Sequence, residues 1–452
     1  MHQRSITFYE YRGFRTPAGA ITDSIHELPV DPEELAALRR LSSQLIPGTS
    51  IFEITNESIR ARSIVGVFSF ADLRIEVLPK LLAPAGGGHA PGDNDIVRNL
   101  MFMLTYTNAL DTWDTDLATL GAADGDFIES YIGSFARRLS THLERYGVPK
   151  RYVETEGNLH FIKGRIDWGR SVAINSFDQS RSYCAFSEFS EENSVARAFK
   201  FVAAALSALT RVSHHDRMLQ RCVGLLDGVQ ARYVEPSVLG RSQHGKRDTN
   251  FLGLIQLTKL FLSRLRPDFA PGVEKVFSLM FDMNKLFEEF IFQALHRNDS
   301  QLGITVTPQK KQPLVEAVRE LLPSGEWQAR SHFDTYSDIK VQFDDGSPPL
   351  IIDTKYKLIG EGRHFGISTS DAYQILAYQQ IHKSRTENPN VLLLYPRFEV
   401  ALKKAFQVSS SDATFAVATV DLSQDLQVSF SEFLDELAGI LGAVSDKRPQ
   451  WP

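Results

Sequence analysis

Apolar and polar residues alternate along the first part of the chain. The alternation over residues 50–54 and 63–70 has the period of two that is typical of half-buried β-strands. A segment rich in Gly and Pro at 83–92 interrupts this pattern and is typical of a loop. We therefore expect residues 1–94 to form a β-rich N-terminal region, folded as a small sheet or barrel.

The period changes to that of a helix after this loop. Apolar positions recur at helical spacing from about 95 to 146, and again over about 194–230 and 250–266. Prolines that begin at Pro267 mark the end of this part of the chain. The pattern predicts a mainly helical middle region over residues 95–270.

Helix and strand patterns are mixed in the C-terminal part, residues 271–452. The expected elements are an amphipathic helix at 281–292, strands at 337–341 and 350–356 around a turn at 344–349, a helix at 371–378 and a strand at 391–395. A strand, a helix and a strand in succession are typical of α/β folds. We expect an α/β core here, within a chain of 452 residues that is long enough for two or three domains.

The second strand of the expected hairpin carries the first candidate chemistry. A period of two places Asp353 and Lys355 on one face of that strand. A turn centred near Asp345 places Asp338 opposite Asp353. Two carboxylates beside a lysine suit Mg²⁺, which prefers oxygen ligands and can activate a water for attack on a phosphate. The alternative is a solvated charge patch, but an acid that follows a buried apolar run is costly unless it has a partner.

A further carboxylate lies on the amphipathic helix at 281–292. Glu289 shares its stripe with polar residues, whereas Glu288 shares one with apolar residues such as Phe292. A carboxylate among apolar neighbours needs a partner, which a metal-bound water or Lys355 would supply. Glu288 is therefore a candidate metal ligand, and a local ion pair is the alternative.

Two residues of the helix expected at 371–378 complete the candidate site. Gln374 and Tyr378 lie four apart, and thus on one side of the helix. Gln374 is a candidate to contact the scissile phosphate or a metal-bound water, and Tyr378 to position it. For Tyr378 the alternative is an aromatic ring packed on the sheet with its hydroxyl at the edge.

The order of these residues resembles the PD-(D/E)XK nuclease superfamily, in which a helix glutamate precedes a strand aspartate, a D-x-K strand and a glutamine-bearing helix. Within it, the chain resembles McrC, the nuclease subunit of McrBC-type modification-dependent restriction systems. The resemblance covers roughly residues 50 to 400. It is carried by the segments 65–67 with 75–80, 100–104, 163–166, 188–193, 283–288 and 353–357.

This resemblance implies a residue-by-residue assignment. The catalytic acids of the family correspond to Asp338 and Asp353, its lysine to Lys355, and its helix-borne glutamate to Glu288. The three acids are the implied ligands of Mg²⁺, and Gln374 completes the candidate catalytic set. One position departs from the pattern, since the superfamily often has proline before the first acid where this chain has a serine.

The resemblance also implies a partner. In this family a hexameric AAA+ GTPase binds methylated double-stranded DNA and translocates, while the McrC-like subunit docks on the hexamer, stimulates GTP hydrolysis and cuts. A β-rich finger of the N-terminal half would enter the hexamer pore, with Arg74 and Lys80 as candidates to reach the nucleotide. The net charge of −6 agrees with a partner that holds the DNA, because duplex affinity comes from clustered Lys and Arg.

Other features exclude further classes of protein. Residues 240–246 fit the phosphate-loop spacing, but Arg247 stands where Ser or Thr would hold Mg²⁺, so we read this segment as a basic loop. The two cysteines are too few for an iron–sulfur cluster held by four thiolates. Without a signal peptide or an apolar run of about 20 residues, we expect a cytoplasmic protein that does not enter a membrane.

Three interpretations stay open at this point. The first is an endonuclease subunit that works with a motor partner, and the second is a free-standing PD-(D/E)XK repair or defence nuclease. The third is a non-catalytic adaptor that regulates a GTPase. The long N-terminal part argues against the second, because it carries no catalytic motif and needs a binding role, and the acids and lysine argue against the third.

Overall fold

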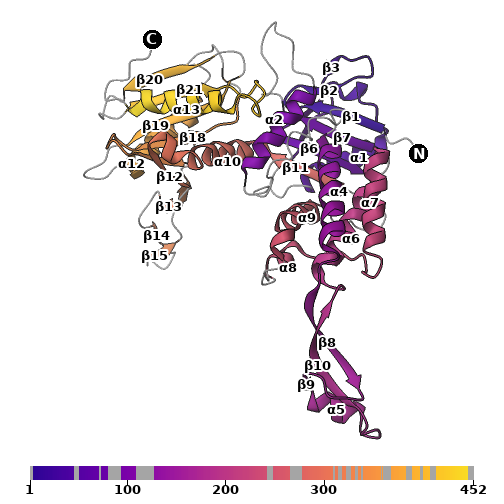
Figure 1. Ribbon diagram of the computed structural model, residues 1–452. Coiled ribbons are helices and arrows are strands. Elements are labelled where there is room, and N and C mark those ends of the chain that lie inside the picture. Colours follow the sequence, from indigo (N-terminus) through magenta and orange to yellow (C-terminus); the bar gives the residue numbers. More distant parts are fainter. Residues whose placement is uncertain are drawn as a thin grey trace. The chain divides into compact units, whose positions relative to one another are not determined.

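The computed structural model describes most of the chain, and helices and strands are labelled as in Figure 1. The described residues are 4–44, 50–70, 73–79, 93–107, 127–241, 248–264, 277–308, 311–313, 318–321, 327–330, 334–336, 339–357, 359, 368–382, 389–397, 401–407 and 414–445. They divide into two compact units, of which one contains Met1–Asp111 with Met280–Pro452 and the other Thr112–Leu279.

A six-stranded sheet forms the N-terminal part of the first unit. Its strand order is β11-β6-β7-β1-β2-β3. These strands are β1 (Arg4–Tyr9), β2 (Gly13–Arg15), β3 (Ile21–Thr22), β6 (Ile64–Phe70), β7 (Leu73–Leu78) and β11 (Phe277–Asp282). Every residue of β6 is buried, and β1 runs parallel to β7 over six residue pairs. The β-rich character expected of this region is therefore present, although β11 joins the sheet from far along the sequence.

Shorter elements surround this sheet. They are η1 (Ile25–Glu27), α1 (Pro32–Gln44), α2 (Asp93–Tyr106) and the two-stranded pair β4 (Phe52–Ile54) and β5 (Ile59–Ala61). Helix α2 contacts the C-terminal part of the same unit, because Asn99 donates hydrogen bonds to the carbonyls of Leu422 at 3.1 Å and Gln424 at 2.7 Å.

The second unit is a helical bundle with one long β-hairpin. Its helices are α4 (Phe127–Tyr146), α6 (Ser194–Ser207), α7 (Ser213–Leu225), α8 (Pro236–Arg241), η3 (Asp248–Phe251) and α9 (Leu252–Arg264). A buried carboxylate ties α4 to the start of α7, since Glu129 accepts hydrogen bonds from the Thr210 hydroxyl at 2.6 Å and the Arg211 amide at 2.7 Å. The predicted helical stretches therefore contain helices, although residues 208–212 and 226–230 within them are not helical.

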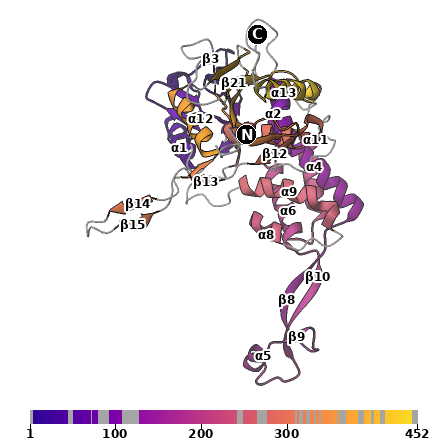
Figure 2. The same ribbon diagram turned by 90° about the vertical axis from the view of Figure 1, so that its left-hand side faces the viewer.

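The hairpin was not predicted from the sequence. Its strands β8 (Arg151–Leu159) and β10 (Ser182–Ser190) pair antiparallel over nine residue pairs, and β9 (Arg165–Ile166) and α5 (Trp168–Ile174) lie between them in sequence. We call residues 151–190 the hairpin arm. Figures 1 and 2 both show it extending away from the bundle helices as a narrow ribbon with α5 toward its tip.

A second six-stranded sheet, with the order β12-β17-β18-β19-β21-β20, forms the C-terminal part of the first unit. Its strands are β12 (Ile304–Pro308), β17 (Ile339–Phe343), β18 (Leu350–Thr354), β19 (Asn390–Pro396), β20 (Lys403–Gln407) and β21 (Thr414–Val420). The predicted pairing is confirmed, because β17 runs antiparallel to β18. The strands β18, β19 and β21 are parallel, so their carboxyl ends meet at one edge of the sheet.

Helices cover both faces of this sheet. The helices are α10 (Met283–His296), α11 (Asp299–Leu302), α12 (Thr369–His382) and α13 (Phe430–Ser445). On one face, Ile351 and Leu393 form a buried cluster with Ile375 of α12. On the other face, Asn390 donates a hydrogen bond of 2.8 Å to the Val444 carbonyl of α13. Rings of α10 and α13 pack together through Phe290 and Phe433, so these two helices share that second face.

Short pairs of strands complete the C-terminal part. They are β13 (Lys311–Pro313) with β16 (Asp334–Tyr336), and β14 (Val318–Leu321) with β15 (Trp327–Arg330). Among the helices in the described part of the chain, none combines the length and the apolar character that a membrane span requires.

Candidate active site

Asp353 and Lys355 come together at the carboxyl end of β18, as the sequence predicted. All five residues of β18 are buried, and the strand is fixed beside β19, where Asp353 pairs with Leu393. The side chain of Asp353 is 1% exposed, and the Lys355 Nζ lies 2.8 Å from its Oδ2. The ammonium of Lys355 therefore offsets the cost of a buried carboxylate at this position.

The face on which this pair lies follows from the alternation of the strand. Asp353 and Lys355 are two and four residues beyond Ile351, which packs against α12. The pair therefore lies on the α12 face, at the edge where the parallel strands end. Ligands of open α/β sheets bind outside this edge.

Asp338 lies outside the described residues. The strand pairing is described up to Ile339, which is opposite Ile352. This is the register that the sequence predicted for the hairpin, and the position of the Asp338 carboxylate itself stays a prediction.

Glu288 lies on α10, which covers the opposite face of the sheet from α12. Its side chain is half-buried, as is that of Glu289, which accepts a hydrogen bond of 2.9 Å from Gln293. The turn of α10 that carries Glu288 is close to the end of β18, because the neighbouring Phe287 ring lies 6.0 Å from the ring of Tyr356. The structure thus joins Asp353 to Lys355, and brings the helix turn of Glu288 near them from the other face.

Gln374 and Tyr378 contact one another on α12. The Gln374 amide donates a hydrogen bond of 2.5 Å to the Tyr378 hydroxyl, as their spacing predicted. Tyr378 is 1% exposed and belongs to the buried cluster that also contains Ile351 and Tyr395. The ring of Tyr378 therefore packs on the sheet, as the alternative interpretation predicted, and a role in positioning Gln374 stays a prediction.

Asp371 is a further acid of this site that the sequence analysis did not single out. It is 5% exposed in the first turn of α12, with Lys357 Nζ at 3.0 Å from its Oδ1. Burial by itself raises the pKa of Asp371, but hydrogen bonds from Ser368 and Lys357, together with the charges of Lys357 and Lys355, hold the pKa below its usual range. Only the residues 368–371, Ser-Thr-Ser-Asp, gave a signal, as a helix-capping sequence.

Tyr395 connects the two acids on the α12 face. Its hydroxyl lies 3.5 Å from Asp371 Oδ2, and its ring is buried at the end of β19. Burial raises the pKa of Tyr395, and the charges of Asp371 and Asp353 raise it further. Both carboxylates therefore lie close enough to the Tyr395 hydroxyl to raise its pKa. With Lys355 and Lys357, the α12 face presents two acids and two lysines together.

This set of donors fits a hard divalent cation. Mg²⁺ is held in many sites by one or two carboxylates together with substrate phosphates, and Asp353 offers such a carboxylate at the sheet edge. Within the described ranges, His, Cys, Asp and Glu side chains form no group of three or more that could hold a metal ion. Asp338, a further candidate ligand, lies outside these ranges.

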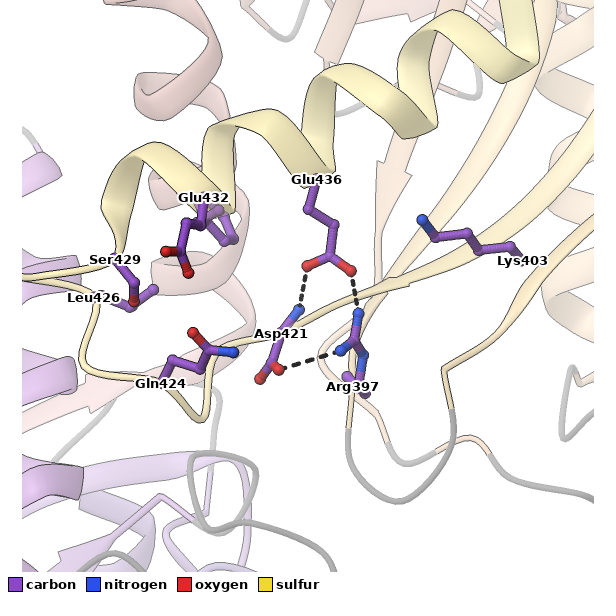
Figure 3. Close-up of a pocket in the computed structure, with 9 residues that line it drawn as sticks. Arg397, Lys403, Asp421, Gln424, Leu426, Ser429, Glu432 and Glu436 are labelled. Carbon is purple, nitrogen blue, oxygen red and sulfur yellow. Dashed lines mark hydrogen bonds and ion pairs between the residues drawn. The ribbon is translucent and has the colours of Figure 1, made fainter.

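A separate pocket lies at the carboxyl ends of β19 and β21, on the α13 face (Figure 3). It is lined by Arg397, Lys403, Asp421, Gln424, Leu426, Ser429, Glu432, Phe433 and Glu436. Arg397 forms an ion pair with Asp421 at 3.2 Å and another with Glu436, which also accepts the Asp421 backbone amide at 3.0 Å. Since two carboxylates balance the Arg397 charge, this network fastens α13 to the sheet.

The structure describes one of the two residues, Arg74 and Lys80, that were candidates for reaching a partner's nucleotide. Arg74 is only 3% exposed within β7, so the hypothesis that it extends into another protein is wrong in this conformation. Lys80 lies outside the described residues, as do Ser242 to Arg247 of the basic loop.

Exposed apolar side chains concentrate on the hairpin arm instead. Of the 15 large hydrophobic residues that are exposed among the described ones, eight belong to the arm. They are Tyr152, Phe161, Ile162, Trp168, Val172, Ile174, Phe177 and Phe189. The side chain of Trp168 is 71% exposed, and that of Phe177 is fully exposed. Such a concentration on a monomer is typical of a surface that binds another protein.

Comparisons with known proteins agree with the resemblance seen in the sequence. A family model described as McrBC 5-methylcytosine restriction system component matches residues 59–396. The type IV methyl-directed restriction enzyme EcoKMcrBC of Escherichia coli (strain K12) is 22% identical over 353 residues, which are 75% of this chain and 96% of that protein.

A solved structure has the same fold over nearly the whole chain. It is a half-complex from a tetradecameric assembly of Thermococcus gammatolerans McrB AAA+ hexamers with bound McrC. The matching chain is 18% identical, with a TM-score of 0.64 over 95% of this chain and 100% of that one. Because the family model matches well over half of its residues, this chain belongs to the family of McrBC 5-methylcytosine restriction system components.

Proposed function

We propose that this chain is the endonuclease subunit of a modification-dependent restriction system, with a PD-(D/E)XK core in its C-terminal part. The observation that carries the proposal is the Asp353–Lys355 pair, a buried carboxylate 2.8 Å from an ammonium at the end of a central strand. A buried carboxylate is costly unless it is paired, and this one lies at the edge of an open α/β sheet where ligands bind, which supports a functional role. Family membership supplies the reaction class, hydrolysis of a DNA phosphodiester.

Each residue has a proposed role. Asp353, Asp338 and Glu288 are the proposed ligands of Mg²⁺, which when bound would supply Lewis-acid chemistry and charge neutralisation at the scissile phosphate. Lys355 stabilises negative charge that develops on that phosphate, because its ammonium is already held at the sheet edge by Asp353. Gln374, oriented by Tyr378, contacts the phosphate from α12.

We also propose that the chain acts in the cytoplasm with an AAA+ GTPase hexamer that holds methylated double-stranded DNA. Two observations support this. The net charge of −6 offers no general basic surface for duplex DNA, and the hairpin arm exposes apolar side chains suited to a protein partner. The solved relative is McrC bound to McrB AAA+ hexamers. The hairpin arm is therefore the proposed docking element, in place of the Arg74 strand.

The test is cleavage of methylated and unmethylated plasmid by the full chain, with Mg²⁺, GTP and the candidate GTPase partner. We expect cutting of methylated plasmid that requires both the partner and GTP, and loss of cutting when EDTA removes the metal. Cutting without the partner would instead indicate a free-standing nuclease. If neither condition gives cutting while the partner's GTPase is stimulated, the chain is an adaptor and the proposal fails.

A further inference from the structure

A buried hydrogen bond links the catalytic strand to the N-terminal sheet. Tyr356 directly follows Lys355, and its hydroxyl donates to Glu10 Oε2 at 3.2 Å. Both residues are almost fully excluded from solvent, with Tyr356 1% exposed and Glu10 0% exposed. They are 346 positions apart in sequence, so this bond fastens two remote parts of the first unit to each other.

The Glu10 end of this link is held rigidly. Glu10 follows β1, and its amide donates to the Leu78 carbonyl at 3.0 Å. The next residue, Tyr11, has a φ of 61°, in the left-handed region that non-glycine residues seldom adopt, and its amide donates to the Ala61 carbonyl at 2.9 Å. Backbone strain of this kind persists only where surrounding contacts fix the conformation. The acceptor for Tyr356 is therefore set in place by the sheet.

The Tyr356 end acts on two elements of the candidate site. Its backbone continues from Lys355, whose amide donates to the Leu394 carbonyl at 2.9 Å. Its ring contacts Phe287 of α10, the residue before Glu288, with the ring centroids 6.0 Å apart. Tyr356 thus contacts the helix that carries Glu288 and directly follows Lys355 along the chain.

The start of α10 is fastened to the same sheet. Ser63, just before β6, accepts a hydrogen bond of 2.8 Å from the Met283 backbone amide through its carbonyl, and its hydroxyl accepts one of 2.9 Å from the side-chain Nδ2 of Asn284. Figure 1 shows α10 leading from β11, at the edge of the N-terminal sheet, toward the sheet that contains β18. Both sides of the candidate site, the β18 end and the α10 turn, are therefore anchored on the N-terminal sheet.

We propose that Tyr356 is a positioning residue for the Asp353–Lys355 pair, and that its hydrogen bond to Glu10 lets the N-terminal sheet set the geometry in which DNA is cut. This inference rests on the proposed nuclease function and concerns the same site. Tyr356 follows Lys355 along the chain and packs on Phe287 of α10, so a fixed Tyr356 keeps the end of β18 and the α10 turn that carries Glu288 in register. A misplacement of about 1 Å at reacting groups can slow catalysis about a hundredfold.

The test compares Tyr356→Phe with the wild-type chain in the complete, partner-dependent cleavage reaction under single-turnover conditions. Phenylalanine keeps the ring on Phe287 and removes only the hydroxyl. We expect the cleavage rate constant to fall about tenfold, as for other residues that orient catalytic groups. The DNA concentration for half-maximal rate and the stimulation of the partner's GTPase are expected to stay unchanged, which a general loss of folding would not produce.

A Glu10→Met variant shows whether the slower cleavage of Tyr356→Phe depends on the hydrogen bond to Glu10. In a Glu10→Met chain the acceptor is absent, so adding Tyr356→Phe is expected to slow cleavage no further. The matched control is Tyr131→Phe, which removes another fully buried tyrosine hydroxyl from α4 in the second unit and is expected to leave the rate unchanged. A wild-type rate for Tyr356→Phe, or the same tenfold loss in the Glu10→Met background, would overturn the inference.

The inference can fail separately from the proposed function. If the wild-type chain does not cut DNA at all, the proposed function fails, and the positioning role is read from amide hydrogen exchange over residues 350–357. We then expect faster exchange at the carboxyl end of β18 in Tyr356→Phe than in the wild-type chain and in Tyr131→Phe. Equal exchange in the three chains would overturn the inference.

Discussion

At the scale of single residues, the candidate site depends on charges that are compensated inside the protein. Asp353 and Asp371 are both almost fully buried, and each has a lysine ammonium within 3.0 Å. An ionised acid in such a place is stabilised by its partner and by hydrogen bonds, and loss of either partner leaves a buried charge. The two pairs lie on the same α12 face, so the site has a built-in positive charge beside each acid.

The lowered pKa of Asp371 predicts a pH dependence of stability. Because the folded-state pKa lies below the unfolded value, the carboxylate stabilises the fold fully above the unfolded pKa of about 4. This stabilisation is lost as the pH falls through the lower folded-state value. The melting temperature of Asp371→Asn should therefore lie below that of the wild-type chain at neutral pH, and the difference should shrink below pH 4.

The matched variant for this prediction is Lys357→Met, which removes an ammonium that lowers the pKa of Asp371. Its melting temperature should follow the same trend with pH, since it acts through the same charge. A difference from the wild-type chain that stays constant between pH 3 and pH 7 would contradict the account of Asp371.

The sequence could predict one of these pairs and not the other. Asp353 and Lys355 are two apart on a strand, so periodicity alone places them together. Asp371, Lys357 and Tyr395 come from a helix, a strand end and a different strand, and only the folded sheet brings them into contact. Asp371 has no unusual neighbour in the sequence, which is why local patterns could not identify it.

At the scale of elements, α13 is held to the sheet by the Arg397 network as well as by apolar packing. The guanidinium bridges Asp421, at the end of β21, and Glu436 on α13 (Figure 3). These side chains are between 17% and 28% exposed, so solvent screens the charges only in part. The network therefore contributes more than a surface ion pair does.

Replacement of this arginine should destabilise the first unit. We expect Arg397→Met to lower the free energy of unfolding by roughly 2 to 3 kcal/mol, because it leaves two carboxylates close together without a counter-charge. The control is Arg181→Met, which breaks the exposed pair with Asp178 and should cost less than about 0.5 kcal/mol. Urea unfolding measures both, and an equal effect of the two variants would argue against the network's role.

The hairpin arm gives a prediction about partner binding. Trp168 and Phe177 are exposed, so their loss costs the isolated chain little stability. If the arm docks on the GTPase hexamer, Trp168→Ser/Phe177→Ser should weaken stimulation of GTP hydrolysis at least about tenfold, as hot-spot aromatics do. Val428→Ser, an exposed apolar residue outside the arm, is the control. Full stimulation by the double variant would remove the arm as the docking element.

The arm also shows why some elements could not be predicted. Sequence patterns report burial, and the predicted strands β6, β18 and β19 are buried throughout. In β8 no residue is fully buried, and Tyr152 is exposed to solvent. A strand that does not border a core lacks the apolar signature on which such predictions depend.

At the scale of the whole molecule, residues from both ends of the sequence form one unit. The N-terminal sheet takes β11 as an edge strand, and Tyr356, just beyond β18, is hydrogen-bonded to it through Glu10. The sequence predicted the β-rich, helical and α/β character of the three parts. It could not predict this connection, because hydrophobic periodicity contains no information about pairing over hundreds of residues.

The central claim is that the Asp353 carboxylate takes part in DNA cleavage. The most direct measurement is the single-turnover rate of methylated plasmid cleavage, with partner, GTP and Mg²⁺, for Asp353→Asn and for Asp345→Asn. Asp345 is an exposed acid in the turn between the same two strands, so it is a matched control. We predict at least a 100-fold loss for Asp353→Asn, as for loss of a group that stabilises the transition state, and a wild-type rate for Asp345→Asn. Equal rates for the wild-type chain and Asp353→Asn would contradict the account.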